Sequence, residues 1–138
     1  MQRIFIPLSF IALLSVLLEA AVQAAEQAPP CEKSPEIVGA CFVVHGRLFF
    51  ANGNPSFRIW RVGTKRVLGV SDWRNAGDMS ADLANLHLPP GIQKRFLENL
   101  DETYIFGDYT VCPLEPEHPG WMQDVCIVRA ENLVVKPR

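Results

Sequence analysis

The fold of this chain is decided by residues 39–70, which read GACFVVHGRLFFANGNPSFRIWRVGTKRVLGV. Apolar residues alternate with other residues over part of 40–50 and again over 56–62, and both stretches are rich in β-branched and aromatic side chains. A period of two residues is typical of a β-strand that buries one face. A third short stretch with β-branched residues follows at 65–70. We therefore predict three consecutive strands.

Two tight turns join these strands into a meander. The first is Ala-Asn-Gly-Asn-Pro at 51–55, where glycine accepts a positive φ and proline has no N–H to donate to a strand ladder. The second is Gly-Thr at 63–64, directly after an apolar residue. Both are hairpin signals, and they are the strongest structural prediction that the chain allows.

The second half of the chain predicts one helix and two further strands. Two prolines and a glycine at 89–91 precede a stretch at 92–100 in which every fourth residue is apolar, as in a helix that starts after proline. Alternation returns at 104–114, and residues 121–129 and 132–135 are strand-like.

The order of elements is strand, strand, strand, helix, strand, strand. Between the third strand and the helix, residues 71–82 lack a period and are predicted as a loop, and Leu83, Leu86 and Leu88 form a helical turn that caps the core. This order predicts a mainly β fold: a small five-stranded OB-like barrel with one short helix. A small β-sandwich and a different α+β roll are the alternatives.

The first residues have the layout of a secretory signal peptide. Arg3 precedes an apolar run at 4–18, and small residues follow it. An uncleaved membrane anchor is the alternative, but the run is short for a span of about 20 residues. We predict a signal peptide at 1–25, a flexible leader at 26–38 and an OB-like β-barrel domain at 39–138. The protein would then be periplasmic or secreted, with no transmembrane segment after cleavage.

The four cysteines all lie in the part that would be exported, and they predict two disulfides. Zinc is the alternative, but no Cys-x-x-Cys pair or nearby histidine completes a ligand set, so we predict no metal and no cofactor. Cys112 and Cys126 flank a loop rich in proline and glycine. The preferred pairing is therefore Cys112 with Cys126 and Cys31 with Cys41, and the other pairings stay open.

Charge is unevenly distributed along the chain. Residues 47–74 carry six Lys and Arg and one acid, whereas residues 98–124 carry seven acids and no Lys or Arg. Two interpretations remain open. Either the two regions neutralise each other across neighbouring strands, or the first region is a functional basic face.

Cations and an aromatic residue in the meander form the candidate binding site. Alternation places Arg58 and Trp60 on one side of their strand and Arg61 on the other. In an OB-like barrel the second and third strands carry the ligand face, and cations with aromatic rings suit anionic ligands. For an exported protein we expect an anionic glycan, a lipid headgroup or an acidic envelope protein rather than nucleic acid. Alternatively, Trp60 is a core residue and the arginines are solvated. The candidate residues are Arg58, Trp60, Arg61, Arg66, Arg47 and His45.

Catalytic motifs are not evident in the sequence, so we expect a binding module rather than an enzyme. There is no nucleophile elbow and no phosphate-binding glycine loop. A hydrolase with a site around His45 and Asp108 is one alternative, motivated by polar residues inside apolar strands. An envelope structural or inhibitor-like protein is another. We predict that Asp108 pairs with an arginine of the first three strands.

Several short motifs resemble those of a group of small exported bacterial proteins without an assigned activity. The motifs are CF..HGRL at 41–48, NGNP..RIW.VGT at 52–64, GDYTVCP at 107–113 and MQ.VC at 122–126. The resemblance covers most of the domain, apart from the leader and residues 71–90. It implies export and a shared fold, and it carries over no functional residue.

Overall fold

The computed structural model describes residues 31–71 and 86–138. The predicted signal peptide, the first part of the predicted leader, and Leu83 with most of the predicted loop lie outside these residues. The elements in chain order are η1 (Cys31–Lys33), β1 (Phe42–Phe50), β2 (Phe57–Arg61), β3 (Val67–Val70), α3 (Pro90–Glu98), η2 (Leu100–Glu102), β4 (Thr103–Pro113) and β5 (Gln123–Pro137).

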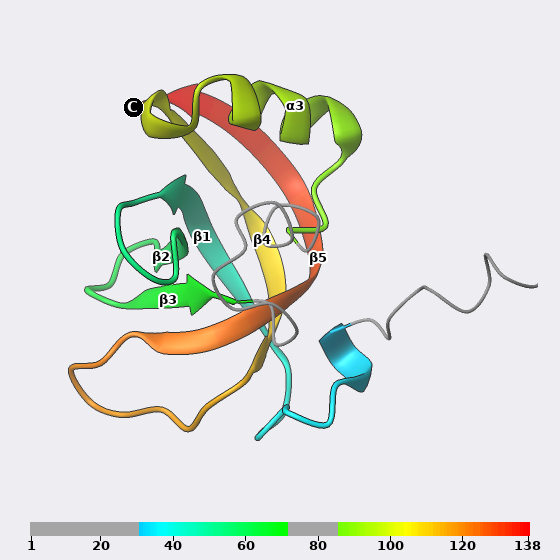
Figure 1. Cartoon of the computed structure of the whole chain (residues 1–138), viewed down its shortest axis with the longest axis vertical. Helices are drawn as coiled ribbons and strands as arrows, with labels where there is room; N and C mark the ends of the chain where they lie inside the picture. Colours follow the sequence, from blue (N-terminus) through cyan, green and yellow to red (C-terminus); the bar gives the residue numbers. More distant parts are fainter. Residues whose placement is uncertain (1–30, 72–85) are drawn as a thin grey trace, which may run out of the picture.

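The five described strands form one sheet in which every strand pairs with two others. The order is β1-β2-β3-β5-β4, and β4 pairs again with β1, so the sheet closes on itself. The pairings are antiparallel except that of β3 with β5, which is parallel. The predicted mainly β fold, with five strands and one short helix in this order, is confirmed (Figure 1).

The last strand is longer than the sequence pattern indicated. The stretches predicted at 121–129 and 132–135 belong to one strand, β5, of 15 residues. Its register with β4 shifts between Phe106 and Asp108, where Asn132 has a φ of 53°. Irregularities of this kind bend a strand. The start of β5 therefore pairs with β3 while the rest follows β4.

Alternate residues of the strands fill the interior, as predicted. Val44, Leu48 and Ile59 are at most 2% exposed. Tyr109 is also buried, its hydroxyl donates to a backbone carbonyl of β4 at 2.8 Å, and burial raises the pKa of this hydroxyl. Gly46 lies on β1 next to the buried side chain of Ile59, and a Cβ at this position would collide with it. The interior has no space for a larger residue at Gly46.

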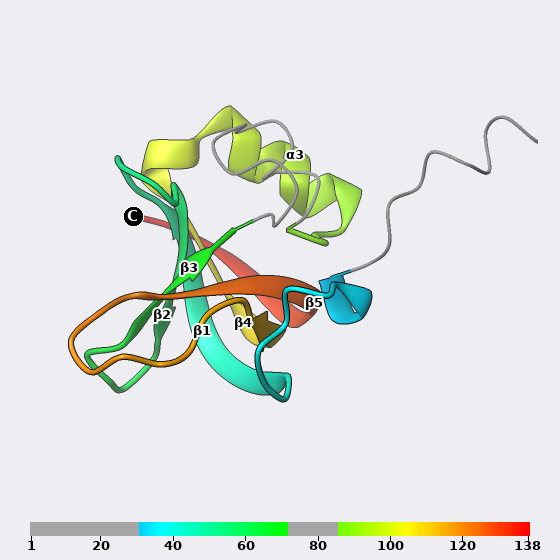
Figure 2. The same cartoon turned by 60° about the horizontal axis from the view of Figure 1, so that its bottom comes forward.

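Helix α3 closes one end of the sheet (Figures 1 and 2). Phe96 is fully buried, and its ring centroid lies 5.9 Å from that of Phe57. Leu86 and Leu88 are buried in the same cluster. The helix starts at Pro90, earlier than predicted, because proline fits the first helical turn. Among the described residues, no helix has the length and apolar character needed to cross a membrane.

The two predicted disulfides are present, but the preferred pairing is wrong. The bridges join Cys41 to Cys112, with Cα atoms 4.1 Å apart, and Cys31 to Cys126, with Cα atoms 6.0 Å apart. The reason is that β4 lies between β1 and β5. Cys112 therefore has a cross-strand neighbour on each side: Cys126 on β5, and Cys41 just before β1. Loop composition alone does not distinguish the two neighbours.

The described part of the predicted leader packs on the domain. Cys31 is 6% exposed and is bridged to β5, and the backbone N–H of Val38 donates to the carbonyl of Pro113 at 3.0 Å. Residues 31–38 are thus attached both covalently and by hydrogen bonding.

Candidate binding site

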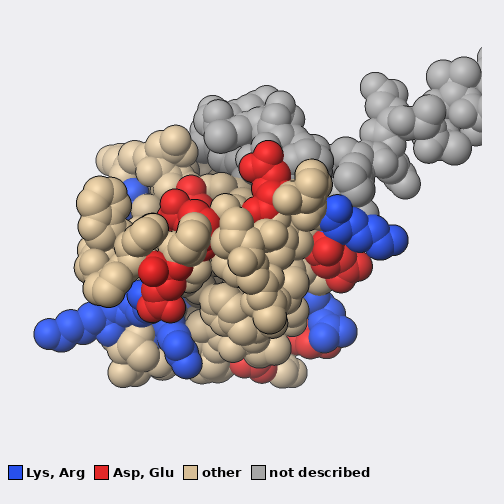
Figure 3. All heavy atoms as spheres, turned by 90° about the horizontal axis from the view of Figure 1, so that it is seen from below, with Lys and Arg blue, Asp and Glu red and all other residues tan. Residues whose placement is uncertain are grey.

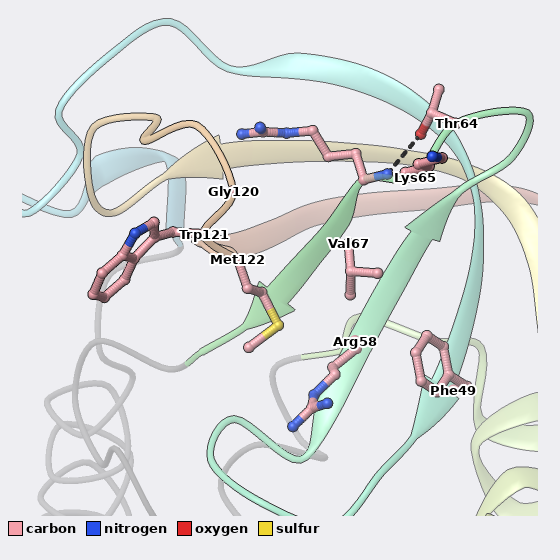
Figure 4. Close-up of a pocket in the computed structure, with 9 residues that line it drawn as sticks. Phe49, Arg58, Thr64, Lys65, Val67, Gly120, Trp121 and Met122 are labelled. Atoms are coloured by element: carbon pink, nitrogen blue, oxygen red, sulfur yellow. Dashed lines mark hydrogen bonds between the residues drawn. The ribbon is translucent and has the colours of Figure 1, made fainter.

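A groove of about 700 Å³ lies on the outer face of the sheet, beside the connection between β4 and β5. Strands β1, β2 and β3, the β2–β3 turn and the β4–β5 connection all contribute side chains to it (Figure 4). Its lining includes Phe49, Arg58, Lys65, Val67, Trp121 and Met122. The groove therefore combines apolar side chains with cations.

The β2–β3 turn that carries Lys65 is fixed by side-chain hydrogen bonds. The indole Nε1 of Trp60 donates to the carbonyl of Thr64 at 2.7 Å. The hydroxyl of Thr64 donates to the carbonyl of Arg61 at 2.9 Å and accepts from the N–H of Arg66 at 3.0 Å (Figure 4). Trp60 is thus half-buried on the outer face and lies outside the core cluster, so its interpretation as a core residue is wrong.

Arg58 is oriented by backbone carbonyls. Its Nε donates to the carbonyl of Pro55 at 3.1 Å, and its Nη2 donates to that of Asn52 at 3.2 Å. Among the described residues, Arg58 has no acidic partner. The guanidinium therefore brings a fixed and uncompensated positive charge to the groove, on the same side of β2 as Trp60, as predicted.

Arg66 and Arg61 have different roles from Arg58. The guanidinium of Arg66 forms an ion pair with Glu117 and donates to the side-chain oxygen of Gln123 at 3.3 Å. For Arg66, the basic region at 47–74 is therefore neutralised by an acid of the region at 98–124, as one of the two interpretations expected. Arg66 lines both the groove and a second hollow of about 240 Å³, which Arg61 and Phe42 also line. The six predicted candidates thus do not form one site.

Acidic and basic side chains are only partly paired on the surface. Figure 3 shows acidic groups at several places on the lower face, some of them next to Lys and Arg side chains near its edges. Within the described part of the chain, Arg66 is the one cation of residues 47–74 that has an acidic partner. Neutralisation therefore explains only part of the basic stretch.

Arg47 lies among aromatic rings. Its guanidinium carbon is 4.1 Å from the ring centroid of Tyr104, 4.8 Å from that of Trp60 and 5.5 Å from that of Phe49. Stacking of this kind suits the planar guanidinium group. Its Nε is buried and has no hydrogen-bond partner among the described residues.

His45 and Asp108 are brought together across β1 and β4. His45 Nδ1 lies 2.8 Å from Asp108 Oδ1, and Asn132 Nδ2 donates to Asp108 Oδ2 at 2.7 Å. The predicted arginine partner of Asp108 is therefore wrong, because the register places His45 directly opposite. The hydrogen bond from Asn132, followed by that from His45, holds the pKa of the Asp108 carboxyl below its usual range.

Residues of the β4–β5 connection were not predicted as part of the site. Trp121 is 76% exposed and Met122 lies next to the groove (Figure 4). The available signal was a tryptophan in the proline-rich stretch between two predicted strands, because loops often carry binding residues. The sequence pattern instead placed Trp121 at the start of a strand, and β5 starts at Gln123.

Comparison of this chain with protein-family models, curated proteins and solved structures finds no match.

Proposed function

We propose that this protein is an exported, non-catalytic binding module with an OB-like barrel, and that its groove holds an anionic component of the cell envelope. The strand order and a helix between the third and fourth strands support the barrel assignment. The two disulfides support an oxidising compartment. The proposal includes membership of the group of small exported bacterial proteins that the motifs resemble.

One observation carries the functional part of the proposal. The groove is lined by Arg58 and Lys65, neither of which has an acidic partner among the described residues, and also by the exposed residue Trp121. A ligand with a negative group and an apolar face would contact both kinds of side chain at once. Charge-assisted hydrogen bonds are the stronger class, so the cations would contribute much of the affinity.

The test compares the parent protein with a double variant, Arg58→Ala with Lys65→Ala. Both proteins are titrated with anionic polysaccharides, with vesicles of anionic lipid and with envelope extracts. A charge-assisted hydrogen bond is worth about 1.5–3 kcal/mol, so we expect affinity for the true ligand class to fall by about tenfold or more. Lys94→Ala is the matched control, because Lys94 is an exposed cation on α3. Equal binding by parent and double variant would rule out this use of the groove.

A hydrolase is the second candidate, favoured by the His45–Asp108 pair. A carboxylate that accepts from Nδ1 leaves Nε2 as the basic nitrogen, which is the arrangement used in acid–base catalysis. The test is a hydrolase screen of the parent against a His45→Gln variant. Activity that survives this substitution would exclude His45 as the base.

A further inference from the structure

The outer face of the sheet carries two rows that combine cations with aromatic rings. Residues in register point to the same face of a sheet. In the first row, Trp60, Arg47 and Phe106 stand side by side on β2, β1 and β4. In the second row, Arg58 pairs with Phe49 and Tyr104 pairs with Lys136, and the ring centroids of Phe49 and Tyr104 lie 6.4 Å apart in an edge-on contact. We call these the cation–ring rows.

The rings of these rows hold the cations in place. The guanidinium of Arg47 lies over Tyr104 and Trp60 at 4.1 and 4.8 Å, and Lys136 Nζ lies 5.1 Å from the Phe106 centroid. Arg138, just after β5, lies over Tyr104 at 5.6 Å. The ring faces that these cations cover are not free to stack a ligand. A ligand on these rows would therefore contact the exposed parts of the cations.

Arg47 in particular lacks an acceptor. Its buried Nε has no hydrogen-bond partner among the described residues, although most buried polar atoms in proteins have one. A guanidinium donates pairs of hydrogen bonds in its own plane, and carboxylate and phosphate groups are the acceptors that match this geometry. The planar side chain of Arg47 therefore suits a ligand with carboxylate or phosphate groups.

The cation–ring rows continue the groove rather than forming a separate site. Arg58 and Phe49 belong both to the groove lining and to the second row. The second row crosses four strands, and strands lie about 4.8 Å apart, so the row is about 14 Å long and about 10 Å of it lies beyond the groove residues. A single headgroup does not cover this length. A chain with repeated negative groups does.

We infer that the ligand is a linear polysaccharide with carboxylates along its length, which lies in the groove and continues across the cation–ring rows. This inference rests on the proposed function. One sugar stacks on the exposed ring of Trp121, and successive carboxylates contact Arg58, Arg47 and Lys136. The disulfides point to an oxidising compartment, which favours a glycan over a nucleic acid as the polyanion.

The test uses the disulfide-bonded protein and measures affinity by calorimetry for a uronic acid disaccharide and for a long oligomer of the same sugar. We expect the oligomer to bind more tightly by about tenfold or more, because each further contact of a tethered group is intramolecular. Arg47→Lys keeps the charge but removes the planar fork. This variant is expected to lose a large part of the gain with length.

Control variants distinguish two negative results: that the ligand is not a long carboxylated chain, and that the groove does not bind the ligand at all. Arg58→Ala is expected to weaken both ligands, and Lys94→Ala neither. Lys136→Ala changes the β5 member of the second row. Melting temperatures show whether each variant is folded. Disaccharide binding that depends on Arg58, without a gain with length, would overturn the inference and leave the groove intact. Binding of neither sugar would overturn both. An equal gain with a neutral glycan or with single-stranded DNA would overturn the assignment to a carboxylated polysaccharide.

Discussion

Removal of the Cys41–Cys112 bridge tests the arrangement of strands on which the binding surface depends. The change is Cys41→Ala with Cys112→Ala, which leaves the Cys31–Cys126 bridge in place. The removed bridge joins residues 71 positions apart, and the other joins residues 95 positions apart. In the chain-entropy treatment, bridges that close loops of these lengths stabilise the folded protein by about 4.4 and 4.7 kcal/mol, respectively.

Unfolding in urea measures the loss of stability that follows removal of the bridge. Small proteins lose about 1–3 kcal/mol of stability per molar urea, so we expect the midpoint of the double variant to fall by about 2 M. The midpoint of the matched variant, Cys31→Ala with Cys126→Ala, is expected to fall by a similar amount. The reason is that the free energies of closing the two loops differ by only about 0.3 kcal/mol. Peptide mapping of the parent is expected to find Cys41 joined to Cys112. An unchanged midpoint, or a peptide in which Cys112 is joined to Cys126, would refute the reasoning.

Three further predictions follow from individual contacts. Trp121→Ala is expected to weaken ligand binding and leave the melting temperature unchanged, because the side chain is 76% exposed; loss of stability would mean that the ring is structural. Gly46→Ala is expected to destabilise the fold by about 1–3 kcal/mol in urea unfolding, because its Cβ would collide with Ile59. Asp108 has a lowered pKa in the folded protein, so its stabilising contribution is present above the ordinary pKa and is lost as the pH falls through the lowered value. Asp108→Asn should therefore flatten the acid side of the profile of melting temperature against pH, and an unchanged profile would contradict this.

The elements of the fold were accessible from sequence because they depend on local patterns. Alternation predicts β1, β2 and β4, since the buried residues of each strand recur every second position. Prolines at 89–90 predict the start of α3 to within two residues. These signals depend on burial and on backbone geometry within one segment, so no long-range contact is needed to interpret them.

The contacts between segments could not be predicted from the sequence in the same way. The partner of Asp108 is set by the register of β4 against β1, and the disulfide pairing is set by the position of β4 between two strands. Arg66 resembles Arg58 in sequence context, yet Glu117 pairs with the former and backbone carbonyls orient the latter. Sequence composition gives the number of charges but does not give their partners.

The register of β1 against β4 links the disulfide to the binding surface. The Phe42–Val111 pair lies next to the Cys41–Cys112 bridge, and the same ladder places Arg47 opposite Phe106. A slip of one residue would turn every side chain of one strand to the opposite face. The cation–ring rows would then lose their β4 members while β1 kept its own. A covalent bond at the end of this ladder excludes that slip, so the bridge holds in place the alignment on which the proposed polysaccharide contacts depend.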